Sequence, residues 1–179
     1  MNTHEVSLAE WLAGSDGCVT LVFSDIVGST NLLYAARTLD YMGMMRAHKR
    51  RAEALIRTHD GRLIGETGDE LLAAFQQAAR AYAFADQLFE DPGHQQLRAR
   101  VGVHFGTVRA EGESLAGRNV HLGARVMQHA VDRELWLSDA AKVALEGESP
   151  ALAARIAWIA HDECELKGVP GRQRLWRAA

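Results

Sequence analysis

The sequence predicts an α+β domain in which helices pack on a largely antiparallel sheet. Three observations support this fold class: a short apolar run at residues 19–23, two apolar runs that meet at a glycine-containing turn, and helical patterns between these runs. The predicted order is strand, helices, two strands, helix, strand, helix, strand. At 179 residues, with no internal repeat or linker, the chain has the length of one domain.

The first predicted strand leads directly to a carboxylate. Residues 19–23 (VTLVF) are β-branched and aromatic, which indicates a buried strand with Ser24 and Asp25 at its end. Residues 28–30 (GST) then supply a turn and the start of a helix, and helical patterns continue to about Thr58.

A second carboxylate falls in a predicted hairpin. Residues 62–64 and 71–75 are expected to be strands joined by a tight turn at residues 67–70, with Asp69 at its tip. The next helix ends at residues 91–93 (DPG) and has one apolar face, formed by Ala81, Phe84, Ala85 and Leu88. The preceding helix has a similar face, formed by Met45, Ala52, Leu55 and Ile56.

The second half repeats the alternation of strands and helices. Residues 98–105 alternate as a strand, 117–128 form a helix, 135–137 a strand and 140–145 a short helix, with further strands after residue 157. Within this tail, the run at residues 161–165 (HDECE) is expected to place alternate side chains on opposite faces of a strand, as a solvated surface.

Composition excludes several classes of protein. A net charge of -3, from 20 basic and 23 acidic residues, gives no general attraction to nucleic acid or to an anionic membrane. Cys18 and Cys164 are far apart and suggest neither a disulfide framework nor a zinc site. The apolar runs are too short to span a membrane, and no secretion signal opens the chain, so we expect a cytoplasmic protein.

Asp25 and Asp69 are candidate metal ligands. Mg²⁺ in phosphate chemistry takes one or two carboxylates together with phosphate oxygens and water, and two aspartates at neighbouring strand ends meet this need. Either aspartate alone also fits a simple turn. The run from Phe23 to Thr30 (FSDIVGST) favours the functional interpretation, because a glycine turn that opens a helix offers free amides to phosphates.

Five motifs in order resemble the class III nucleotide cyclases: FSDIVGST, TGDELLAAF, RVGVHFG, NVHLGARV and LKGVPG. The resemblance covers residues 17–178 and implies a catalytic domain at residues 17–179 after a short N-terminal extension at residues 1–16. It also implies a ferredoxin-like βαββαβ core and a head-to-tail homodimer with each active site at the subunit interface.

The resemblance assigns roles to individual residues. Asp25, Asp69 and the Ile26 carbonyl would bind two Mg²⁺ or Mn²⁺ ions, while the partner subunit's helix would supply Arg125 to the α-phosphate. The implied reaction converts a nucleoside triphosphate to a 3′,5′-cyclic nucleotide and pyrophosphate. Without the resemblance, Arg125 is equally an exposed helix residue, and a lysine before a glycine is common in solvated turns. The residues implied to bind the nucleotide are Phe23, Ile26, Val27, Gly28, Ser29, Thr30, His121 and Lys167.

The positions that read the base depart from the family. ATP-using members carry lysine and aspartate or threonine where this chain has Gly65 and Ser114, and GTP-using members carry glutamate and cysteine there. Glu66 is one residue away, so in a regular strand it points to the opposite face. His121 replaces an asparagine and is either a nucleotide contact or an interface residue, and Arg118 is a further candidate contact.

Two explanations compete for this departure: a degenerate regulatory copy, or a pocket for another base. The presence of both aspartates and the arginine disfavours a degenerate copy. Because the chain resembles the bacterial branch of the family that has altered base readers and makes cyclic UMP or cyclic CMP in anti-phage signalling, we hypothesise a pyrimidine cyclase that uses UTP, then CTP. The alternatives are an ATP or GTP cyclase with unusual base readers, a nucleotide-binding module without turnover, and another two-metal phosphoryl transfer enzyme.

Overall fold

The computed structural model describes residues 6–35 and 37–179. Its strands are β1 (Cys18–Ile26), β2 (Arg62–Thr67), β3 (Glu70–Phe75), β4 (Ala99–Thr107), β5 (Arg109–Glu111), β6 (Ser114–Ala116), β7 (Leu135–Ser138), β8 (Trp158–Glu165) and β9 (Arg172–Ala178). Its helices are α1 (Leu8–Ala13), α2 (Ser29–Ala35), α3 (Thr38–Thr58), α4 (Ala78–Glu90), α5 (Arg118–His129), α6 (Asp139–Glu148) and α7 (Pro150–Ala153).

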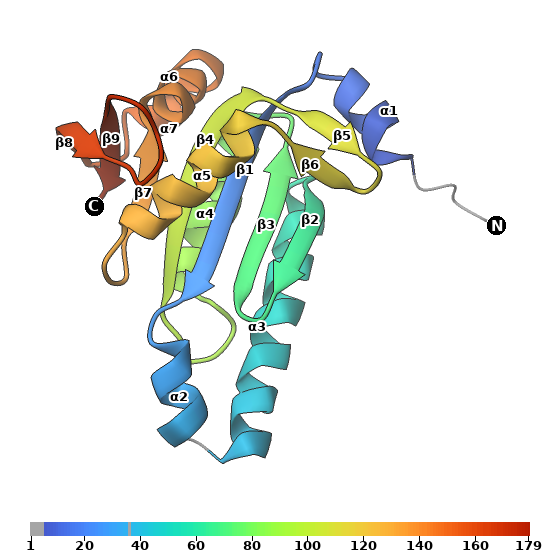
Figure 1. Cartoon of the computed structure of the whole chain (residues 1–179), viewed down its shortest axis with the longest axis vertical. Helices are drawn as coiled ribbons and strands as arrows, with labels where there is room; N and C mark the ends of the chain where they lie inside the picture. The colour runs from blue at the N-terminus through green and yellow to red at the C-terminus, as the bar shows by residue number, and fades with distance from the viewer. Residues whose placement is uncertain (1–5, 36) are drawn as a thin grey trace.

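One large sheet organises the molecule (Figure 1). Its strand order is β2-β3-β1-β4-β7-β9-β8, while β5 and β6 form a separate hairpin. Among the described residues, β4 and β7 are the parallel pair of the large sheet, and its other neighbours are antiparallel. The largely antiparallel sheet predicted from the sequence is therefore confirmed.

The first four strands form the expected βαββαβ unit. They follow the order β2-β3-β1-β4, and α3 and α4 connect strands across one face of the sheet. In Figure 1 these two helices lie behind the sheet, whereas α5 crosses in front of β1 and β4. The ferredoxin-like core implied by the resemblance is confirmed.

The main core lies between the sheet and the helices α3, α4 and α6. All four residues predicted on the apolar face of α4 are buried, as are Ala52, Leu55 and Ile56 of α3. Met45 packs against the same cluster, as expected, but is only partly buried, whereas its neighbour Met44 is buried. Adjacent helix residues point about 100° apart, so the buried stripe is wide enough to include both methionines.

A second cluster covers the opposite face of the sheet. Leu8 and Leu12 of α1 are buried against Val19 and Leu21 of β1. This helix begins with a capping box, in which the Ser7 amide donates to the Glu10 carboxylate at 3.0 Å. Residues 1–5 of the expected N-terminal extension lie outside the described residues. In the described part of the chain, every helix is too short or too polar to cross a membrane.

Two local features differ from the predictions. The strand β1 continues to Ile26, so Asp25 lies inside the strand rather than beyond its end. In β8, the pairing with β9 shifts register between His161 and Cys164, so the expected strict alternation of residues 161–165 does not hold. Four of these five residues are nevertheless exposed, and the buried one is Cys164.

Candidate active site

Asp25 and Asp69 meet at one end of the sheet. The strands β1 and β3 pair antiparallel with Ser24 opposite Leu71, so the end of β1 lies beside the β2–β3 turn. Gly68 forms this turn with a φ of 66°, a conformation that favours glycine. The structure thus brings together two carboxylates that are 44 positions apart in the sequence.

The environment of this pair favours a positive charge. Burial raises the pKa of the Asp25 carboxyl, and a hydrogen bond with Asp69 raises it further, because two close carboxyl groups resist double ionisation. Arg100, the Cα partner of Asp25 on β4, acts in the opposite direction by donating from Nε to Asp25 Oδ2 at 2.9 Å. Asp69 Oδ2 is buried without a hydrogen-bond partner.

A divalent cation fits this set of donors. Mg²⁺ and Mn²⁺ prefer oxygen ligands, and Asp69 has one buried oxygen without a partner. Asp25, Asp69 and the Ile26 carbonyl would hold the metal. Among the described residues, no three or more histidine, cysteine or acidic side chains converge to form a metal site of their own. Phosphate oxygens and water would therefore have to complete the coordination.

Arg100 and Glu70 also belong to the site, although the sequence analysis did not select them. Glu70 opens β3, and burial raises the pKa of its carboxyl, with the charges of Asp25 and Asp69 raising it further. Arg100 stands out only once the register of β1 and β4 is known. The sequence carried one local signal for Glu70, its position directly after Asp69.

A buried histidine, His48, lies behind the turn and was also missed. Its Nδ1 is 2.8 Å from the carbonyl oxygen of Pro92, which can only accept, so Nδ1 carries the proton. Its Nε2 is buried without a partner, and His48 lines a cavity of about 320 Å³ together with Asp69 and Glu70. The available signal was a polar residue at helical spacing within the buried stripe of α3.

The loop after β1 offers fewer free amides than expected. The Val27 amide donates to the Arg98 carbonyl at 2.8 Å, so it is not available to a phosphate. Gly28 has a φ of 69°, and α2 starts directly after it. Ser29 and Thr30 occupy the first turn of this helix, where amides have no intrahelical acceptor.

The base-reading candidates on β2 point to opposite faces. A bulge shifts the β2–β3 register between Leu63 and Gly65, but it precedes both candidates, so their alternation is kept. Gly65 pairs with Leu72, whereas Glu66 pairs with the buried Leu71. On the α3 face, the Glu66 carboxylate accepts a hydrogen bond from Lys49 Nζ at 2.5 Å. Glu66 therefore does not share a face with Gly65.

The helix α5 carries His121 and Arg125 and ends near Arg100, whose Nη1 donates to the Ala130 carbonyl at 3.2 Å. His121 is exposed and Arg125 is half-buried, with a guanidinium NH that donates to Gln128 on the same helix. Gly123 lets α5 approach β1, because a Cβ there would lie 2.7 Å from the Phe23 ring. Phe23 thus packs beneath α5 and is largely buried.

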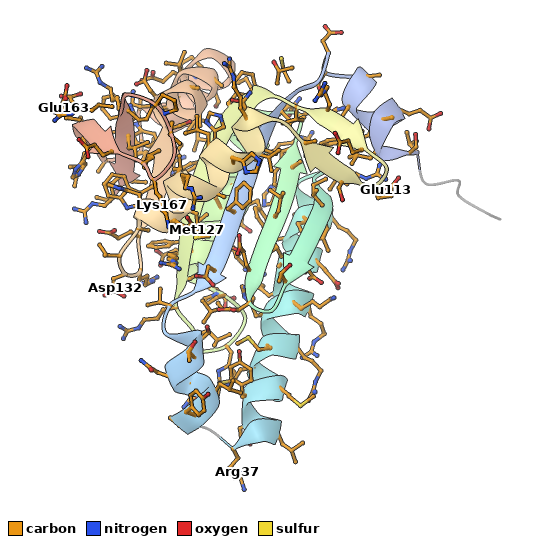
Figure 2. All side chains as sticks on the ribbon, viewed as in Figure 1. Arg37, Glu113, Met127, Asp132, Glu163 and Lys167 are labelled. Atoms are coloured by element: carbon orange, nitrogen blue, oxygen red, sulfur yellow. The ribbon has the colours of Figure 1, made fainter. Side chains whose placement is uncertain are left out.

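Three of the remaining candidates are exposed: Lys167, Ser114 and Arg118. Lys167 and Ser114 lie in two separate parts of the chain, the β8–β9 loop and the β5–β6 hairpin. Lys167 lies in the β8–β9 loop, whose neighbour Leu166 packs in one cluster with Val126 of α5. Figure 2 labels Lys167 on the same side of the molecule as Met127 of α5. Ser114 lies in the β5–β6 hairpin, which Figure 1 shows at the end of the sheet away from the tip of β1.

The fold and this site define a class of protein: a βαββαβ domain in which two aspartates converge beside a glycine turn. A family model, the adenylate and guanylate cyclase catalytic domain, matches residues 12–177. The chain belongs to this family.

Individual relatives agree with this assignment. The adenylate cyclase of Streptomyces coelicolor is 31% identical over 106 residues, which cover 58% of this chain and 28% of that protein. A putative adenylate cyclase 3 of Rhizobium meliloti is 26% identical over 164 residues, which cover 87% and 27%. The chain thus spans about a quarter of the length of these two relatives.

Solved structures share the fold. The guanylate cyclase domain of RhGC from Catenaria anguillulae, in complex with GTP, superposes with a TM-score of 0.78 at 21% identity, covering 91% of this chain and 96% of that one. A Trypanosoma brucei adenylate cyclase in its monomeric state gives 0.78 at 23% identity, with coverage of 90% and 89%.

Proposed function

We propose that this chain is the catalytic part of a nucleotide cyclase. It would convert a nucleoside triphosphate to a 3′,5′-cyclic nucleotide and pyrophosphate. The observation that carries the proposal is the convergence of Asp25 and Asp69, with a buried carboxylate oxygen left unpartnered, in a domain of the cyclase family. The two carboxylates supply only some of the oxygen ligands that a divalent cation needs, and a triphosphate would supply the others.

In this reaction the ribose 3′-oxygen bonds to the α-phosphorus, the bond to the β-phosphate oxygen breaks, and the hydroxyl proton passes to solvent. Two divalent metal ions, Mg²⁺ or Mn²⁺, would neutralise the phosphates and make the hydroxyl more acidic. Asp25 and Asp69 would hold those ions. Arg100 would exchange its bond to Asp25 for a phosphate oxygen once a cation occupies that carboxylate, since a guanidinium suits either anion.

A homodimer completes the proposed site. Arg125 would stabilise charge on the α-phosphate and Lys167 would bind the terminal phosphates, both from the partner subunit, while His121 faces the nucleotide. Two facts support this arrangement: within one chain Arg125 donates to Gln128 rather than to the carboxylate end, and the Lys167 loop packs against the same helix. The positive charges of Arg125 and Lys167 would suit the negatively charged phosphates held by the partner subunit.

The proposed substrate is a pyrimidine nucleotide, UTP first and then CTP, giving cyclic UMP or cyclic CMP as an anti-phage second messenger. The support is the absence of a purine-reading side chain at two positions. Gly65 has no side chain, and a Cβ built there would meet nothing within 4 Å; Ser114 is short and exposed. The lysine that reads adenine in related enzymes is therefore missing. An adenylate or guanylate cyclase with unusual base readers, or an inactive nucleotide-binding module, are the competing functions.

The test is incubation of the purified protein with ATP, GTP, UTP and CTP separately, each with Mn²⁺, followed by chromatography of the products. We expect pyrophosphate and a cyclic pyrimidine nucleotide, and a loss of at least about a hundredfold in Asp25→Asn and Asp69→Asn. Asp132→Asn, on an exposed loop, is the matched control (Figure 2). Cyclic AMP alone would refute the pyrimidine substrate, and no pyrophosphate from any nucleotide would refute the cyclase.

A further inference from the structure

A second polar assembly lies on β4, away from the carboxylate pair. Gly102, His104 and Gly106 alternate along the strand and face α5. A Cβ at Gly106 would lie 2.5 Å from the side chain of Asn119, and one at Gly102 would lie 2.2 Å from the backbone of Met127. The two glycines therefore let α5 lie close to the sheet, and His104 is the side chain between them, only 3% exposed.

His104 bonds through both ring nitrogens. Its Nε2 is 3.1 Å from Asn119 Oδ1, and its Nδ1 is 2.8 Å from Ser138 Oγ. Asn119 in turn donates from Nδ2 to the Thr107 carbonyl at 2.8 Å, which leaves its Oδ1 as the acceptor. Nε2 must therefore carry the proton, and Nδ1 must accept from the Ser138 hydroxyl. Burial lowers the pKa of His104, in agreement with this neutral form.

This assembly replaces an ordinary cap at the start of α5. The residue before the helix is Gly117, which makes no side-chain capping bond. Asn119, the second residue of α5, is instead tied to β4 through His104 and through Thr107. Ser138 extends the same chain of bonds to α6, because its Oγ accepts from the Ala141 amide at 3.2 Å.

The geometry points to His104 as a positioning residue for the half of the active site that α5 carries. We propose that His104, protonated on Nε2, fixes the first turn of α5 through Asn119 and so sets the positions of His121 and Arg125, which follow on the same helix. This inference rests on the proposed function, in which Arg125 completes the site of the partner subunit.

The distinguishing experiment uses heterodimers. Two differently tagged copies of the chain are co-expressed, purified through both tags and assayed with the nucleotide that the wild type turns over. In the control heterodimer, one copy carries Asp25→Asn and the other carries Arg125→Ala. Both substitutions then fall in the same site and the second site stays intact, so the control should recover about half of the wild-type activity. His104→Asn keeps the acceptor for Ser138 but is too short to reach Asn119, and should lower the activity of its homodimer about tenfold or more.

The inference predicts which partner rescues His104→Asn. Paired with Asp25→Asn it should recover about half of wild-type activity, because the intact site takes Arg125 from the copy with an intact α5. Paired with Arg125→Ala it should show about half of the low activity of its own homodimer, because only one of the two sites retains an Arg125 side chain. Rescue by both partners or by neither would overturn the inference, since it would show no link to α5. A control pair that fails to complement refutes the shared site of the proposed function itself.

Two further measurements separate positioning from general instability. His104→Gln extends a donor nitrogen towards Asn119, so it should retain most of the activity that His104→Asn loses, at equal or lower thermal stability. Hydrogen exchange, which does not depend on turnover, should become about tenfold faster in residues 118–125 of His104→Asn and unchanged in β1. Equal activity of the two variants, or faster exchange throughout the sheet, would count against the inference.

Discussion

The close approach of α5 to β4 makes Gly102→Ala a demanding test of the structure. The added Cβ would lie 2.2 Å from the Met127 nitrogen and 2.4 Å from its Cα, whereas ordinary contacts begin at 3.4 Å. These atoms belong to the helix backbone, so no rotamer change relieves the overlap, and α5 must move by about 1.2 Å. Overpacking of this kind costs about 1–3 kcal/mol of unfolding free energy.

The expected result is a melting temperature lower by roughly 3–10 °C, measured by differential scanning calorimetry. Because a displacement of about 1 Å in a positioned group can cost about a hundredfold in rate, cyclase activity should fall by a similar factor. Gly43→Ala is the matched control, since nothing lies within 4 Å of its Cβ position and its φ is not positive. A melting temperature that Gly102→Ala leaves unchanged would refute the close packing of α5.

Two further results are expected. Burial lowers the pKa of His104, so only the unfolded chain takes up a proton as the pH falls through about 6.5, and stability present above that pH is lost below it. Urea unfolding at about pH 7.5 and about pH 5.5 should therefore show a smaller loss for His104→Gln than for the wild type, and equal losses would contradict the buried neutral histidine. Gly65→Lys combined with Ser114→Asp should raise cyclic AMP formation relative to other products by at least about tenfold, measured by chromatography; an unchanged product ratio would show that the base is read elsewhere.

Local patterns were sufficient for most of the fold. The helix α4 has a clear apolar stripe and ends at Glu90, directly before Asp91-Pro92-Gly93. The βαββαβ order follows from the alternation of such helical stripes with apolar strands. The hairpin tip at Asp69 was predictable because glycine precedes it in a run between two apolar strands. The three-residue strands β5 and β6 were not predicted, because so short a run carries little periodic signal.

The missing parts of the site depend on pairings that no local pattern contains. Arg100 becomes a neighbour of Asp25 only through the register of two strands that are far apart in the sequence. The Val27 amide is lost to Arg98 for the same reason. His48 reaches the turn because α3 packs behind it, although its helical spacing did mark it as a polar residue in a buried stripe.

The charged run in β8 has a consequence for how copies of the chain assemble. This strand is the last in the sheet, and an open strand edge invites further strands to add on. Here Asp162 and Glu163 are exposed and pair with Arg174 and Arg172 across the β8–β9 ladder, beside the register shift. A neighbouring strand would meet these charges and the irregular backbone, so end-to-end growth into a continuous sheet is disfavoured.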